Sequence, residues 1–107
     1  MTSMSNWIEV CDAEEIEAED VIQVDRDGKV LAIYRSPEDE FFATAGVCTH
    51  EHACLADGLV MGDIIECPKH NGRFDYKTGE AKSPPVQVDL ETYPVKTENG
   101  KVFVDLG

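Results

Sequence analysis

The feature that most constrains this chain is a pair of short polar segments, each with one cysteine and one histidine. The first, CTHEH, contains Cys48 and His50, and the second, CPKH, contains Cys67 and His70. In an extended loop, residues two apart project to the same side, so Cys48 and His50 can point at one centre. Pro68 bends the second segment. We therefore expect a fold that brings two loops face to face around a four-coordinate site.

This set of two cysteines and two histidines suits two kinds of metal centre: a structural zinc ion, or an iron–sulfur cluster with histidines in place of two cysteines. Zinc sites of this composition usually take both cysteines from one turn and both histidines from a helix. Here each segment supplies one of each, and no helix is predicted to carry the histidines. The spacing favours the cluster. A zinc-stabilised binding module without redox activity stays open as the alternative.

Most of the chain is predicted to form short β-strands, because apolar and polar residues alternate between turn signals. The dipeptides Asp27-Gly28 and Asn99-Gly100 favour positive φ and predict two tight hairpins. The one helical candidate, residues 12–20, has a thin apolar stripe and is expected to form a single turn with a capping box. Strands are expected at 7–11, 21–25, 29–35, 41–45, 63–66, 86–90, 93–97 and 101–106. The predicted fold class is all-β, a small antiparallel sandwich or barrel.

Acidic residues dominate the charge of the chain. Asp and Glu total 22 against 9 Lys and Arg, so the formal net charge is -13 at pH 7. Such a charge repels phosphate backbones and anionic lipids, which argues against nucleic acid and membranes as partners. It suits docking to a basic partner surface, although solubility alone is the simpler explanation. With no bilayer-spanning apolar run and no secretion signal at the start, the protein is expected in the cytoplasm.

The spacing of the four candidate ligands resembles a known signature. The sequence CTH (48–50), sixteen residues, and then CPKH (67–70) is similar to the Rieske [2Fe-2S] motif. The similarity continues through residues 57–86 and is to the stand-alone Rieske ferredoxins of bacterial ring-hydroxylating and related oxygenases. The resemblance implies one Rieske-type [2Fe-2S] cluster per chain. Cys48 and Cys67 would hold one iron, and His50 and His70 the other.

The same resemblance also implies how the chain is organised. It implies a single Rieske domain over residues 1–107, which agrees with a length that allows one compact body. The cluster-binding part, with its two ligand loops, would span about residues 46–86. In this family a third, proline-containing loop shields the cluster, and Ser83-Pro84-Pro85 stands in its place.

The other cysteines do not match the respiratory-complex type of Rieske protein, in which one extra cysteine per loop forms a disulfide. Cys54 lies six residues after Cys48, and Lys69 occupies the corresponding place in the second loop. The resemblance is therefore to the low-potential branch, near the bottom of a range of about −150 to +300 mV. Cys54 and Cys11 are interpreted as packing residues, and His52 as a polar loop residue.

A catalytic site of its own is not expected. The oxygenase subunits that contain a Rieske domain also need a mononuclear iron held by two histidines and a carboxylate. This chain has 3 histidines, two of which are assigned to the cluster. No G-x-G-x-x-G fingerprint indicates a flavin or nicotinamide site. The chain is thus predicted to carry electrons rather than to act as an enzyme.

The resemblance implies a route for these electrons. A reductase, expected to be flavin-dependent, would supply them singly, and a terminal oxygenase with its own Rieske centre would accept them. The oxygenase is expected to be an aromatic-ring dioxygenase or a related catabolic enzyme, and this chain is expected to be a monomer. The nearer alternative keeps the cluster but changes the system, to a small subunit of assimilatory nitrite reductase or a ferredoxin for a demethylating monooxygenase.

Overall fold

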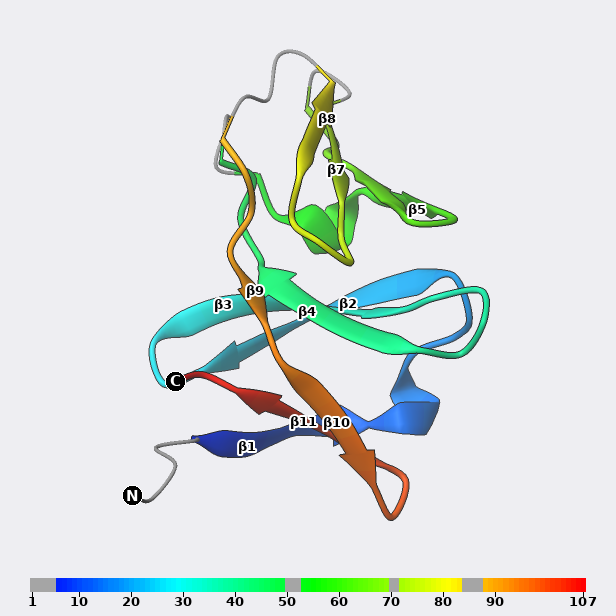
Figure 1. Cartoon of the computed structure of the whole chain (residues 1–107), viewed down its shortest axis with the longest axis vertical. Helices are drawn as coiled ribbons and strands as arrows, with labels where there is room; N and C mark the ends of the chain where they lie inside the picture. The colour runs from blue at the N-terminus through cyan, green and yellow to red at the C-terminus, as the bar shows by residue number, and fades with distance from the viewer. Residues whose placement is uncertain (1–5, 50–52, 70–71, 84–87) are drawn as a thin grey trace.

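The computed structural model describes residues 6–49, 53–69, 72–83 and 88–107, which form three antiparallel sheets (Figure 1). The outer sheet, in spatial order, consists of β1 (Trp7–Asp12), β11 (Lys101–Asp105) and β10 (Val95–Glu98). The middle sheet consists of β2 (Asp20–Arg26), β3 (Lys29–Arg35), β4 (Phe41–Ala45) and β9 (Thr92–Tyr93). The loop sheet consists of β5 (Leu59–Met61), β6 (Ile64–Glu66), β7 (Arg73–Asp75) and β8 (Ala81–Ser83). The all-β antiparallel prediction is confirmed.

The middle sheet separates two hydrophobic cores. Along β3, Leu31 and Ile33 point into the outer core, which lies against the outer sheet, and Ala32 and Tyr34 point into the loop core, which lies against the loop sheet. All four side chains are fully buried. Strand side chains alternate between faces, so a strand covered on both sides reads as a continuous apolar run. This explains the segment VLAIY within β3.

Both predicted hairpin turns are confirmed. Asp27 and Gly28 have φ values of 51° and 77°, and Asn99 and Gly100 have φ values of 53° and 77°. The flanking residues pair directly, Arg26 with Lys29 and Glu98 with Lys101. Two central residues at positive φ are the geometry that a two-residue primed turn requires.

The helical candidate is also confirmed as a single turn. The 3₁₀ helix η1 (Ala13–Glu15) follows β1, and Glu15 Oε2 accepts a hydrogen bond of 2.7 Å from the Asp12 backbone N–H. A second 3₁₀ turn, η2 (Leu55–Asp57), was not predicted. Neither helix in the described ranges is long or apolar enough to cross a membrane.

The predicted strand at 86–90 is wrong over its described part, residues 88–90, while residues 86 and 87 lie outside the described ranges. Residues 89 and 90 form single hydrogen bonds to the end of the β7–β8 hairpin and do not form a ladder with a neighbouring strand. The Leu90 N–H donates to the Gly79 carbonyl at 2.7 Å, and the side chain of Asp89 accepts from the Ala81 N–H at 2.9 Å. Alternation along VQVDL therefore reflects the burial of Leu90 and not strand pairing.

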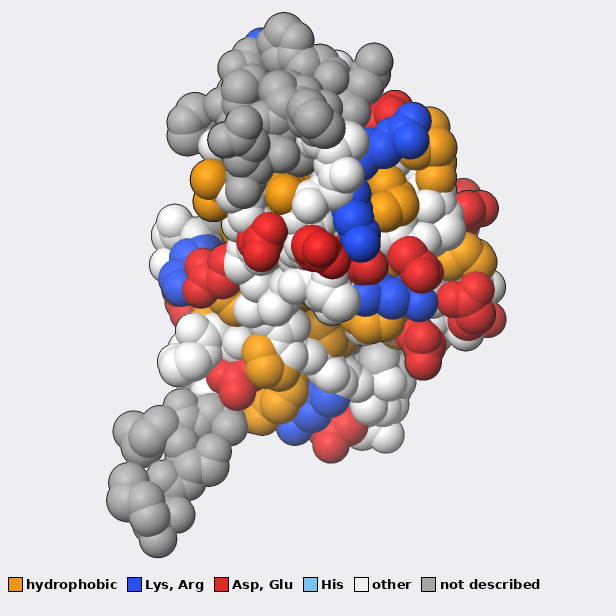
Figure 2. Space-filling view, turned by 45° about the horizontal axis from the view of Figure 1, so that its top comes forward, with side chains coloured by type: hydrophobic (Ala, Val, Ile, Leu, Met, Phe, Trp, Pro, Cys, Tyr) orange, Lys and Arg blue, Asp and Glu red, His pale blue; other side chains and the backbone are white. Residues whose placement is uncertain are grey.

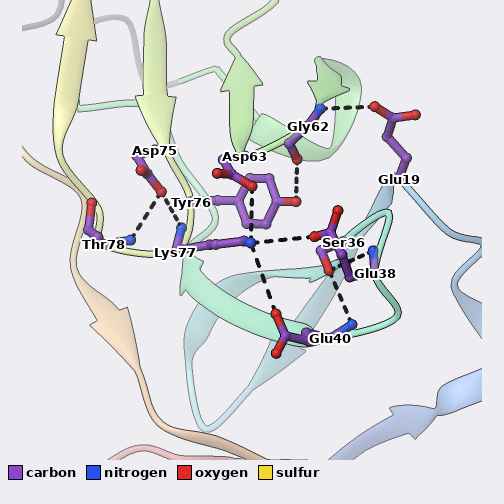
Figure 3. A network of polar contacts seen from close by, with 10 residues as sticks. All are labelled: Glu19, Ser36, Glu38, Glu40, Gly62, Asp63, Asp75, Tyr76, Lys77 and Thr78. Carbon is purple, nitrogen blue, oxygen red and sulfur yellow. Dashed lines mark hydrogen bonds and ion pairs between the residues drawn. The ribbon is translucent and has the colours of Figure 1, made fainter.

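The loop sheet rests on the middle sheet through a network of polar contacts (Figure 3) and through aromatic contacts beside it. Lys77 Nζ lies 3.0 Å from Asp63 Oδ1 and 3.6 Å from Glu38 Oε1, and it also lies 5.3 Å above the ring of Phe42. Beside it, the Tyr76 ring stacks on Tyr34 of β3, with centroids 4.6 Å apart. These contacts fix the loop sheet on its support.

The same contact continues at the turn between β5 and β6. The Tyr76 hydroxyl donates to the Gly62 carbonyl, and the Gly62 N–H donates to Glu19 Oε2 at 2.9 Å (Figure 3). Glu19 precedes β2, so the middle sheet is joined to the loop sheet here as well.

Candidate metal centre

The two cysteine segments form loops that close in the same way. The Cys48 N–H donates to the Ala53 carbonyl at 2.8 Å, and the Cys67 N–H donates to the Gly72 carbonyl at 2.7 Å. Residues 48–53 are called the first loop and residues 67–72 the second loop. In each, the cysteine is held by a residue five positions later. The backbone at both cysteines is thus fixed where each loop leaves the core.

Both cysteine side chains are buried in one place. Cys48 and Cys67 are each 1% exposed and belong to the loop core, together with Leu55, Ile65 and Phe74. Cysteine sulfurs bind metals as thiolates, and a charge in an apolar core needs a compensating charge beside it. A bound iron supplies that charge. Two sulfur donors from separate loops in one apolar core therefore fit an iron–sulfur cluster.

The two predicted histidine ligands lie outside the described residues. His50 is in the first loop and His70 in the second, and His52 also falls in the undescribed part. The structure thus brings the two predicted sulfur donors into one core and leaves the predicted nitrogen donors untested.

Close backbone contacts position the first loop. The Gly46 N–H donates to the Val30 carbonyl at 2.8 Å, and the Gly46 carbonyl accepts from the Leu55 N–H at 2.9 Å. A Cβ atom at Gly46 would lie 2.9 Å from the Leu31 carbonyl carbon, so a larger residue cannot fit without a backbone shift. Val47 and Cys54 then form an isolated antiparallel bridge. The residue two positions before the first loop is therefore anchored to β3.

Strands β6 and β7 position the second loop. Glu66, the last residue of β6, pairs with Arg73, the first residue of β7, and Arg73 Nε lies 3.0 Å from Glu66 Oε2. Phe74 is fully buried. Strand β7 thus supplies a core side chain, Phe74, and an ion pair, Arg73 with Glu66, directly after the second loop.

A contact far apart in sequence joins the first loop to the segment after residue 87. Thr49 Oγ1 donates to the Val88 carbonyl at 2.8 Å. Val88 is 63% exposed, whereas Leu90 is buried in the loop core. Sequence reasoning missed this contact, because nothing local marks a pair of residues separated by 39 positions. It places an exposed apolar side chain near the first loop.

The remaining cysteines are Cys11 and Cys54. Cys11 is buried in β1 among outer-core residues, and desolvation raises its pKa to about 11. A thiol that stays protonated at neutral pH is a poor nucleophile and a poor metal ligand. Cys54 is half-buried beside the first loop. Cys11 is therefore a packing residue, and the packing role of Cys54 stays a prediction.

Comparison with known proteins agrees with these observations. A family model described as the Rieske [2Fe-2S] domain matches residues 6–94. The chain is 47% identical over 100 residues to the ferredoxin component of the naphthalene 1,2-dioxygenase system of Pseudomonas putida, with 94% of this chain and 95% of that protein covered.

Solved structures share both the fold and the sequence similarity. A ferredoxin of Sphingomonas yanoikuyae B1 superposes with a TM-score of 0.89 at 39% identity, with 95% of this chain and 100% of that chain covered. A complex of reduced oxygenase and oxidised ferredoxin in carbazole 1,9a-dioxygenase gives a TM-score of 0.86 at 39% identity, with 92% of each chain covered.

Proposed function

Because the chain belongs to the Rieske [2Fe-2S] domain family, we propose that Cys48, His50, Cys67 and His70 are the ligands of its cluster. The two cysteines would hold one iron and the two histidines the other. The observation that carries this proposal is the burial of both cysteines, each 1% exposed, in one core. The matching closure of the two loops supports it, since each loop then presents its histidine two or three residues after its cysteine.

The chain carries a Rieske-type [2Fe-2S] cluster and is an electron carrier rather than an enzyme. When bound, the cluster supplies a one-electron couple at a higher potential than all-cysteine ligation, because neutral imidazoles replace two thiolates. The chain's own residues keep the two cysteines in an apolar core, and one backbone hydrogen bond fixes each cysteine at the start of its loop.

The proposed acceptor is a terminal oxygenase with its own Rieske centre, in an aromatic-ring dioxygenase or related catabolic system. The name of the Pseudomonas relative and the ferredoxin–oxygenase complex of carbazole 1,9a-dioxygenase support this assignment. The proposed donor is a flavin-dependent ferredoxin reductase. We propose that the chain works in the cytoplasm as a monomer, and that residues 1–107 form one domain whose cluster-binding part spans about 46–86.

The surface charge suits such transient partners. Figure 2 shows acidic side chains across the middle of the presented face, with Lys and Arg among them. With a net charge of -13, the chain attracts a partner that presents basic residues and repels other acidic proteins. The charge would mainly raise the rate of encounter, which salt screens.

The ligand assignment is tested by electron paramagnetic resonance of the dithionite-reduced protein. Mixed histidine and cysteine ligation predicts a lower average g value than all-cysteine ligation. Replacing His50 with Cys should lower the midpoint potential, because it restores a thiolate. A cluster-loaded H50C protein with an unchanged potential would contradict the assignment, and so would iron analysis without acid-labile sulfide in the native protein.

The partner assignment is tested by stopped-flow oxidation of the reduced protein with a purified aromatic-ring dioxygenase. Electron transfer should be fast at low ionic strength and slow as salt is added. A matched assay uses an assimilatory nitrite reductase large subunit. Faster transfer to the nitrite reductase, or no salt dependence with the dioxygenase, would overturn the proposed acceptor or the proposed steering, respectively.

A further inference from the structure

One buried hydroxyl group has no hydrogen-bond partner. In the described part of the chain, Ser83 Oγ is the only buried side-chain nitrogen or oxygen without one. The other buried hydroxyls are all used: Tyr34 bonds to Thr44 at 2.8 Å, and Ser36 Oγ accepts the N–H groups of Glu38 and Glu40. A buried polar group without a partner costs about 1–3 kcal/mol, so this exception calls for an explanation.

The surroundings of the Ser83 side chain are read from its burial and not from alternation along the strand. Ser83 is the last residue of β8, and the register with β7 shifts between Ala81, which pairs with Phe74, and Ser83, which pairs with Arg73. Such a β-bulge interrupts the alternation of side chains between the two faces. The hydroxyl of Ser83 is nevertheless buried.

The position of Ser83 along the sheet is close to the second loop. Ser83 pairs with Arg73 in the β7–β8 ladder. Arg73 directly follows Gly72, whose carbonyl accepts the N–H of Cys67. The unpaired hydroxyl thus belongs to the residue that pairs with the first residue after the second loop, which carries a proposed ligand.

From this placement we propose that Ser83 Oγ donates a hydrogen bond to a sulfur atom of the bound cluster, either a sulfide or a cysteine sulfur. The proposal rests on the proposed ligand assignment. A hydroxyl carries one donor and cysteine sulfur is a weak acceptor that becomes stronger when charged. Within the described ranges no protein atom accepts this hydrogen, and a cluster held by Cys48 and Cys67 would supply sulfur acceptors in this part of the molecule.

Such a bond would make Ser83 a positioning residue that raises the reduction potential. One added electron makes the cluster more negative, and a donor aimed at its sulfur stabilises the reduced form more than the oxidised form. Sequence analysis places Ser83 in the segment Ser83-Pro84-Pro85, which is expected to shield the cluster, and gives its hydroxyl no role. In the proposal, the hydroxyl of Ser83 has a function of its own.

The test is a redox titration of the cluster-loaded wild type, S83A, S83T and the control T78A. Thr78 is exposed in the turn between β7 and β8, so T78A removes a hydroxyl from the same sheet without touching the core. S83A should weaken electron uptake about tenfold, which is a midpoint about 59 mV more negative. S83T keeps a hydroxyl and should recover most of that shift, and T78A should leave the potential unchanged.

The outcomes separate this inference from its premise. Equal potentials for wild type and S83A, with full iron and sulfide content in both, would overturn the hydrogen bond. A low average g value in both proteins would then still support histidine ligation. An all-cysteine g value in the wild type would instead overturn the ligand assignment on which the inference rests.

A second measurement covers the case in which S83A fails to bind the cluster. The serines of the chain are Ser3, Ser5, Ser36 and Ser83, so wild-type protein labelled with ¹³Cβ-serine gives a small set of nuclear magnetic resonance signals. On reduction, the Ser83 signal should shift or broaden strongly. Ser36, in the middle part of the fold beside Glu40, should stay near its diamagnetic position. An unperturbed Ser83 signal would overturn the proposal.

Discussion

The middle sheet and the loop sheet are built by different means. Strands β2 and β3 pair along their full seven-residue lengths, and β3 is covered by apolar side chains on both faces. Each strand of the loop sheet has three residues, and two cysteines belong to the core beneath it. Long ladders and apolar burial can hold a sheet without a cofactor, whereas short strands need further contacts. We therefore expect the loop sheet to depend on the cluster and on the middle sheet for its stability.

Breaking the ligand set should have the largest effect and should separate the two regions. In C67A we expect complete loss of the cluster, because one of its proposed ligands is removed. Hydrogen exchange should then become faster at amides of the loop sheet, such as those of Ile65 and Phe74, and change little in β2 and β3. The control C54A should keep its cluster. Equal loss of protection in both regions would show that the middle sheet also requires the cofactor.

The next largest effect is expected at Gly79. This residue has a φ of +85°, and a Cβ atom there would lie 2.3 Å from the Leu90 carbonyl oxygen. G79A should therefore cost about 3 kcal/mol of unfolding free energy, from backbone strain and displacement of Leu90. The matched control is G28A, at φ +77° with no atom within 4 Å of the added Cβ, which should cost about 1 kcal/mol.

Denaturant unfolding monitored by circular dichroism measures this pair. At Gly79 the close approach to Leu90 adds to the strain of a positive φ, whereas at Gly28 the positive φ acts alone. If G79A and G28A lose equal stability, strain alone explains both, and the close approach of Gly79 to Leu90 contributes nothing measurable.

Alkaline pH should weaken the contact between the two regions. Desolvation raises the pKa of Tyr76 from 10.0 to about 12, so its neutral form is favoured in the folded state. A group with a raised folded-state pKa contributes stability that is complete below pH 10 and is lost as the pH rises through about 12. This rise corresponds to at most about 3 kcal/mol of unfolding free energy. Y76F should lose correspondingly less stability between pH 10 and pH 12 than the wild type.

A control in the middle sheet sharpens this experiment. Tyr93 in β9 also has a pKa raised to about 12, first by desolvation and then by its hydrogen bond to Glu91, but it is only half-buried. Y93F should therefore change the pH profile less than Y76F. Unfolding titrations at pH 8, 10, 11 and 12 would measure both. A larger change for Y93F would contradict the role of Tyr76 as the buried member of this contact.

The smallest effect is expected for the ion pair beside the second loop. Arg73 Nε and Glu66 Oε2 are 3.0 Å apart, but the Arg73 side chain is 51% exposed. Exposed pairs are screened by water and salt, so R73M should cost about 0.5 kcal/mol at low ionic strength and less at 1 M salt. Thermal unfolding at both salt concentrations checks this. A loss above about 2 kcal/mol would mean that Arg73 supports the loop sheet in another way.

The middle sheet was more predictable from sequence than the loop sheet, for a physical reason. Turn chemistry at Asp27-Gly28 and Asn99-Gly100 and alternation in long strands are local signals, and both turns were predicted correctly. Strands β5, β7 and β8 were not predicted, because three-residue strands carry too few positions for a period to emerge. Their conformation is set by neighbours rather than by their own pattern.

The candidate site divides in the same way. Spacing alone identified Cys48 and Cys67, which lie in one buried core. The bond from Thr49 to Val88 and the unpaired hydroxyl of Ser83 could not be predicted. Both depend on how distant segments meet across the sheet, which no short motif records. Even the segment 88–90 was misassigned, because its alternation reflects one buried leucine.

Because β3 is buried on both faces, it limits how the cluster-binding part of this chain can be transferred to another protein. Ala32 and Tyr34 line one core while their neighbours Leu31 and Ile33 line the other. A host protein that receives residues 46–90 must therefore offer a strand with an apolar surface ready to be covered, in the same register. Inserting or deleting one residue in that strand would exchange the two sets of side chains and disrupt both layers at once.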